Sequence, residues 1–209
     1  MYIGDLRAQT NLVALWQLNG NSTDTSGAGL NGTDTTITYS QANGKIGQGA
    51  GFNGTSSYIG AGAWPVLKGL SMTAWIKQAP SAVRTILSGS GNANVQFRIS
   101  ADSTPILELI KSQIAGIGAS TKLLVNDMWT FAGASYATNG AWAFYVNGDQ
   151  YGAGTTDLAI TQQNINIGAS VGGTAEFFKG GMGNVSIFNV VKDALWFKKQ
   201  YMAYKGFWI

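Results

Sequence analysis

The amino-acid sequence predicts an all-β sandwich that is followed by a short C-terminal helix. Three observations lead to this fold class. Apolar residues alternate with other residues in many short segments, turn signals separate those segments, and charged residues make up only 11% of the chain against a typical ~25%. The 209 residues are enough to bury a large core without a disulfide. No linker or shift in composition divides the chain, so one sandwich domain is predicted.

The first predicted strand lies in residues 12–18. Ala14, Trp16 and Leu18 share one face there, which is what a half-buried strand requires because successive side chains point to opposite sides. The same period of two recurs in later segments: residues 95–99, 142–146 and 165–167. Residues 12–195 are therefore assigned to the sandwich and residues 1–11 to an N-terminal extension.

Asn-Gly pairs mark turns between the predicted strands. Asn147-Gly148 follows the alternating residues 142–146 and precedes Gln150-Tyr151. A two-residue hairpin loop of type I′ needs positive φ at both central positions, and Asn-Gly meets that requirement best. The sequence therefore predicts a hairpin at this turn.

Residues 196–209 form a tail with a helical pattern. Its aromatic residues recur at i, i+4, i+7 and i+11: Phe197, Tyr201, Tyr204 and Trp208. Phe207, Trp208 and Ile209 add large apolar side chains at the end of the tail. Two interpretations stay open: the stripe packs on the chain's own sandwich, or it docks onto a neighbouring subunit. The docking hypothesis assigns Phe197, Tyr201, Tyr204, Phe207 and Trp208 to the subunit contact.

Composition excludes several classes of protein. Without cysteine or histidine, the chain has no disulfide, no zinc finger, no thiol nucleophile and no imidazole base. A net charge of +3 is too small for the concentrated basic surface that nucleic-acid binding needs. Residues 1–7 lack the apolar run of a signal peptide, and no run approaches the ~20 residues that span a bilayer. No nucleic acid and no membrane insertion are expected, and the chain is expected to be made without cleaved export.

Blocks that occur in order along residues 12–204 resemble a laminin G-like domain of the concanavalin A-like superfamily. They include Asp24-Thr25-Ser26-Gly27, the glycine-rich residues 44–54, the Trp-containing residues 70–77 and the later strands at residues 129–136, 144–148, 165–168 and 180–191. The resemblance implies a two-sheet antiparallel jelly roll. It also places Trp16, Trp75 and Trp129 at core positions, where burial is expected.

The resemblance further implies a calcium site. Many relatives use a carboxylate at the position of Asp24 together with carboxylates in a late strand, where this chain has Gly183 and Asn184 instead. Calcium prefers six to eight hard oxygen ligands, so the missing carboxylate weakens the expected site. Asp24 is the candidate metal ligand, and the alternative is that it caps its own Ser/Thr/Gly loop.

Sugar binding is the chemistry that remains for this composition. Exposed aromatic rings stack on sugar faces and nearby amides or carboxylates bind hydroxyls, so Trp64, Tyr151 and Asp149 are the candidate carbohydrate-binding residues. Superfamily relatives include β-glucanases, which need a pair of carboxyl groups. Glu108 and Glu176 are the chain's two glutamates, and both are expected to face solvent and not to act in catalysis.

The leading hypothesis is a non-enzymatic structural or adhesive protein on the surface of a bacteriophage particle, as a capsid decoration, head fibre or tail adhesin. It would be assembled in the bacterial cytoplasm with other virion subunits or as a homo-oligomer, and it would contact host-surface glycans or proteins. The alternative is a stand-alone carbohydrate-binding module or lectin. A glycoside hydrolase is the third hypothesis.

Overall fold

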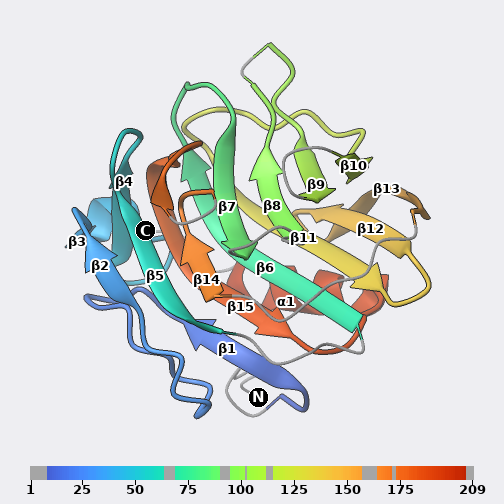
Figure 1. The fold of residues 1–209 in the computed structure, drawn as a ribbon, viewed down its shortest axis with the longest axis horizontal. Coiled ribbons are helices and arrows are strands. Elements are labelled where there is room, and N and C mark those ends of the chain that lie inside the picture. The colour runs from blue at the N-terminus through green and yellow to red at the C-terminus, as the bar shows by residue number, and fades with distance from the viewer. Residues whose placement is uncertain are drawn as a thin grey trace.

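The computed structural model describes residues 9–63, 69–89, 95–101, 103–111, 115–156, 164–170 and 173–205. Within them the chain forms two β-sheets that face each other, with one helix behind the first sheet (Figure 1). All described strand pairs are antiparallel. The predicted two-sheet antiparallel sandwich is confirmed.

The first sheet, called sheet A, has eight strands. Their order is β13 (Asp149–Thr155), β12 (Ala141–Val146), β11 (Trp129–Ala137), β6 (Gly69–Gln78), β15 (Lys179–Phe188), β4 (Gly49–Asn53) and β3 (Thr38–Ser40), and β1 (Leu12–Trp16) pairs with β15. The second sheet, called sheet B, has seven strands. Their order is β10 (Ala115–Ala119), β9 (Leu107–Lys111), β8 (Val95–Ile99), β7 (Arg84–Gly89), β14 (Asn164–Ile167), β5 (Tyr58–Ala63) and β2 (Thr33–Thr35). A short 3₁₀ helix, η2 (Gln41–Asn43), joins β3 to β4.

The main core lies between the two sheets. Alternate residues of β6 enter it, among them Met72 and Ile76, and they meet residues of sheet B such as Phe97 and Ile165. Trp16, from β1, is also completely buried in this core, as expected, and its indole N–H donates to the carbonyl of Leu30 at 2.7 Å. Period-two alternation therefore predicted which residues of these strands face inward.

The outer face of sheet A carries a second, smaller core beneath α1 (Ala194–Lys205). Asp193 begins this helix by accepting a hydrogen bond from the backbone N–H of Trp196 at 2.7 Å, as an N-cap residue does. The predicted C-terminal helix is thus confirmed. Among the described residues, no helix is long and apolar enough to cross a membrane.

The predicted hairpin joins β12 to β13. Asn147 and Gly148 have φ values of 52° and 81°, which are the positive angles that a type I′ turn needs. Glycine also makes room for α1 here, because a Cβ atom at Gly148 would lie 2.8 Å from Cβ of Tyr201. The same turn therefore reverses the chain and supports the helix.

Candidate functional site

Asp24 organises the loop that follows β1. Its side-chain oxygens accept hydrogen bonds from the backbone N–H groups of Leu15, Ser26 and Leu30 at 2.9–3.0 Å, and from the Ser26 hydroxyl at 2.9 Å. Both oxygens are thus engaged within the chain, an arrangement that fits loop capping better than a metal ligand. A calcium ion at Asp24 stays a prediction, and it would have to displace these donors.

Tyr151 and Asp149 lie on β13 but take part in different contacts. Tyr151 is half-buried, packs against the main core, and has Nζ of Lys122 5.5 Å from its ring centroid. Asp149 forms an ion pair with Lys198 of α1 at 2.7 Å. The third candidate for sugar binding, Trp64, lies outside the described residues. Sugar binding by Tyr151 and Asp149 stays a prediction.

The aromatic stripe of α1 faces sheet A. Phe197 is completely buried and stacks on Tyr145 with ring centroids 3.8 Å apart and an interplanar angle of 12°. Its ring leaves no surface for a neighbouring subunit, so the docking hypothesis is wrong for this residue. Tyr201 and Tyr204 are half-buried, and subunit docking through them stays a prediction. Phe207 and Trp208 lie outside the described residues.

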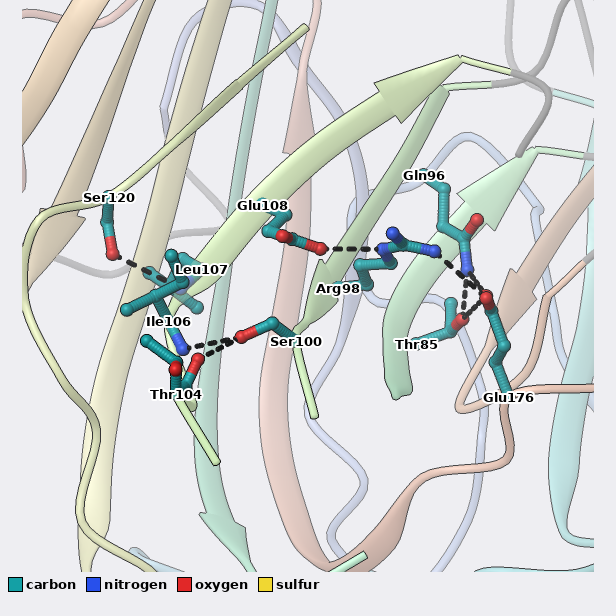
Figure 2. A network of polar contacts seen from close by, with 10 residues as sticks. All are labelled: Thr85, Gln96, Arg98, Ser100, Thr104, Ile106, Leu107, Glu108, Ser120 and Glu176. Atoms are coloured by element: carbon teal, nitrogen blue, oxygen red, sulfur yellow. Dashed lines mark hydrogen bonds and ion pairs between the residues drawn. The ribbon is translucent and has the colours of Figure 1, made fainter. Parts of the chain in front are cut away.

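The two glutamates share one arginine on the outer face of sheet B (Figure 2). Arg98 donates to Oε2 of Glu108 and to Oε1 of Glu176, each at 2.9 Å, and Gln96 also donates to Glu176. The side chains of both glutamates are 20–23% exposed, so they face solvent only in part. Cross-strand pairing of Arg98 with Glu108 produces this arrangement, and no local sequence pattern indicates it.

A pocket of about 460 Å³ opens where α1 meets sheet A. Its walls come from four segments that are far apart in the sequence: η2 with the residues after it, β6, the turn before β11, and the C-terminal half of α1. The residues that line it are Gln41, Ala42, Gly44, Lys45, Trp75, Asp127, Met128, Trp129, Tyr201 and Lys205. Aromatic rings together with amide, carboxylate and ammonium groups form a lining typical of a small-molecule site.

Trp75, one of the residues that line the pocket, carries a buried hydrogen-bond donor that has no acceptor among the residues the structure describes. Trp75 is 2% exposed and packs with Tyr201 at a ring-centroid distance of 5.9 Å. Its indole N–H finds no partner, although a buried donor without an acceptor costs about 1–3 kcal/mol.

Sequence reasoning missed this pocket. Trp75 is buried as expected, but it lies beneath α1 and not between the two sheets. Trp129 is only half-buried and lines the pocket, so its assignment to the core is wrong. A signal was present for Trp75, because the alternation in β6 places it opposite Met72 and Ile76. No signal linked β6 to the turn at Asp127, since that contact is set by the tertiary fold.

Comparisons with known proteins agree with this architecture. Residues 49–195 match the family profile of the concanavalin A-like lectin/glucanases superfamily, in its laminin G-like branch. Among curated protein sequences, none matches significantly.

Three solved structures illustrate the similarity in fold. The first is domain 4 of AbnA, a GH43 extracellular arabinanase from Geobacillus stearothermophilus, in complex with arabinotriose; it is 22% identical, the match covers 90% of this chain and 96% of that one, and the TM-score is 0.73. The second is the binding domain of botulinum neurotoxin serotype G, at 14% identity, 94% and 52% coverage and a TM-score of 0.72. The third comes from a study of botulinum neurotoxin type C, whose cell entry depends on interaction with two ganglioside molecules, at 12% identity, 93% and 51% coverage and a TM-score of 0.69. The chain spans about half the length of the two toxin chains, and all three likenesses establish the fold alone.

Proposed function

The chain belongs to the concanavalin A-like lectin/glucanase superfamily, and on that premise we propose that it is a non-enzymatic carbohydrate-binding protein whose ligand occupies the pocket between α1 and sheet A. The observation that carries the proposal is the lining of the pocket, in which the aromatic residues Trp75, Trp129 and Tyr201 lie beside amide, carboxylate and ammonium groups. A saccharide offers both an apolar ring face for Trp129 or Tyr201 and oxygens for hydrogen bonds. The arabinanase domain that shares this fold holds a trisaccharide, which supports the same class of ligand.

The environment of the two glutamates supports a binding role over hydrolysis. A glycosidase needs two carboxyl groups that flank an open space for the scissile bond and, in inverting enzymes, for a water molecule. Here the guanidinium of Arg98 lies between Glu108 and Glu176 and is hydrogen-bonded to both.

A glycan array followed by calorimetry tests the proposal. We expect saturable binding to a limited set of glycans, and we expect Trp129→Ala to weaken it on the order of tenfold or more, because a central aromatic contact is lost. Tyr151→Ala is the matched control, since this variant removes the aromatic ring that sequence reasoning favoured and leaves the pocket intact. Loss of binding in Tyr151→Ala with full binding in Trp129→Ala would move the site to the β12–β13 hairpin and contradict the proposal, as would silence on every glycan.

Exposure on a bacteriophage particle is a finer proposal, and it rests on the sequence features alone. The low charge content and the apolar tail favour it, with other virion subunits or a second copy of the chain as partners. Immunogold labelling of purified virions is the direct measurement. Labelling on the particle surface would support it, and its absence from virions would leave the lectin alternative.

A further inference from the structure

Three large apolar side chains are exposed close together in the segment between β10 and β11. Leu123, Val125 and Met128 are 55%, 58% and 59% exposed, and all three line the same small hollow. Single exposed apolar residues are common on protein surfaces, whereas a group of them marks a site of interaction. These three residues are called the apolar patch.

The backbone beneath the patch is held in place. Leu124 is buried in the main core, and its backbone N–H donates to the carbonyl of Pro105 at 2.7 Å, while that of Asp127 donates to a carbonyl of β6 at 2.7 Å. Side chains at residues 123–125 are exposed, buried and exposed in turn, which is typical of an extended segment. Burial of Leu124 therefore leaves Leu123 and Val125 facing outward.

The apolar patch adjoins the proposed binding pocket. Its hollow has a volume of about 90 Å³, and Met128 and Trp129 line both this hollow and the pocket. Whole ligands occupy pockets of roughly 300–1,000 Å³, so the hollow is large enough for only part of a ligand. A molecule bound in the pocket can continue past Trp129 onto the patch.

The pocket and the hollow differ in chemistry. Beside the apolar patch, the polar side chains of the hollow are engaged within the chain. Asn147 accepts a hydrogen bond from the backbone N–H of Phe131 at 2.9 Å, and the hydroxyl of Thr130 donates to a backbone carbonyl at 3.5 Å. The ammonium group of Lys122 lies 5.5 Å from the centroid of an aromatic ring of β13. The patch therefore favours a hydrocarbon group, whereas the mixed lining of the pocket favours a saccharide.

We propose that the ligand of the pocket is a glycolipid, a saccharide bonded to a hydrocarbon chain. The saccharide occupies the pocket, and the first part of the chain crosses Trp129 and lies on the apolar patch. This inference rests on the proposed function and names its class of ligand. Three side chains supply far less than the ~800 Å² per partner that a stable protein interface buries, so a small ligand fits the patch better than a second copy of the chain.

NMR titrations with the methyl and octyl glycosides of one sugar test the inference. Arabinose, glucose and galactose are used in turn, below the concentration at which micelles form, and octyl tetraethylene glycol supplies the same hydrocarbon chain without a sugar. Each methylene that the patch covers should tighten binding about two- to fourfold, so an octyl glycoside should bind on the order of tenfold more tightly than its methyl counterpart. Octyl tetraethylene glycol should bind more weakly than that octyl glycoside. Amide signals of residues 123–128 should shift with the octyl glycoside and not with the methyl one.

Variants of the patch locate the gain in affinity. Leu123→Ser and Val125→Ser should each lower the ratio of octyl to methyl affinity about threefold, because each removes apolar area from the hydrocarbon contact. Leu195→Ser is the matched control, since this leucine of α1 is 60% exposed and lines neither the pocket nor the hollow. It should leave the ratio unchanged.

The outcomes separate this inference from the proposed function. Equal affinity for the methyl and octyl glycosides of every sugar would overturn the glycolipid and leave a lectin for the saccharide alone. Equal binding of octyl tetraethylene glycol would also overturn it, because the patch would then act without the sugar. So would sedimentation that shows a dimer which Leu123→Ser dissociates, since a second copy would then cover the patch. If neither these glycosides nor any glycan on the array binds, the proposed function itself fails.

Discussion

Replacing Phe197 with alanine tests how α1 is attached to the sandwich. The ring is completely buried, stacks on Tyr145, and meets Trp196 edge-on with ring centroids 5.0 Å apart and planes at 90°. Truncating a buried phenylalanine costs about 3–5 kcal/mol, and for a domain of this size each kcal/mol lowers Tm by ~2–4 °C. We therefore expect Phe197→Ala to lower the free energy of unfolding by ~3–5 kcal/mol and Tm by roughly 6–20 °C.

Urea denaturation followed by tryptophan fluorescence measures this loss. Leu195→Ala is the control on the same helix, because Leu195 is 60% exposed and its truncation should change stability by no more than ~0.5 kcal/mol. Both variants should be measured at two protein concentrations that differ tenfold. A loss below ~1 kcal/mol in Phe197→Ala, or a loss that depends on protein concentration, would refute the packing within one chain and return the helix to a subunit contact.

Three further predictions follow from the packing and the polar contacts. Asp24→Ala should lower the free energy of unfolding by on the order of 3–5 kcal/mol, because four hydrogen-bond donors lose their acceptor. None of these bonds needs a metal, so urea denaturation should give the same loss in EDTA and in calcium. A loss seen only in calcium would contradict this. Gly133→Ala should lower the free energy of unfolding by ~1–3 kcal/mol, since the new Cβ would lie 2.6 Å from Cε1 of Phe197. In a double-mutant cycle with Phe197→Ala, the combined loss should be smaller than the sum of the two single losses, because removal of the ring removes the clash. Full additivity would argue against the clash. Burial raises the pKa of Tyr145, so above pH ~10 the unfolded chain loses the phenol proton before the folded chain does, and the free energy of unfolding should fall with rising pH. In a pH series of urea melts, the free energy of unfolding of Tyr145→Phe should fall less steeply than that of the unmodified protein. Equal slopes for the two proteins would exclude this cause.

Strands and the β12–β13 hairpin could be predicted because their signals are local. Alternation assigns residues such as Met72 to one face, and Asn147-Gly148 supplies the positive φ angles that the turn needs. The attachment of α1 was harder, since an aromatic stripe shows which face is apolar and not what covers it. Gly133 held a clue, because a glycine inside a strand often marks a close approach, here that of Phe197.

The candidate site depends on tertiary contacts that no local pattern contains. Trp75, Asp127 and Tyr201 are separated by at least 52 residues in the sequence and meet only when β6, the turn before β11 and α1 have packed. The ion pairs of Arg98 depend in the same way on the register of β8 with β9 and on the approach of Glu176. Composition could exclude metal-thiolate and imidazole chemistry, but it could not place these groups.

Because Tyr201 and Lys205 belong to α1 while Trp75 and Trp129 belong to sheet A, the pocket exists only when the helix is docked. Local detachment of the helix and loss of ligand are then one coupled equilibrium. By mass action, a ligand present at 100 times its Kd opposes detachment by about 2.7 kcal/mol, which corresponds to a roughly hundredfold smaller population of the detached state. Ligand should accordingly slow amide hydrogen exchange and proteolytic clipping in α1 far more than in the strands of sheet B.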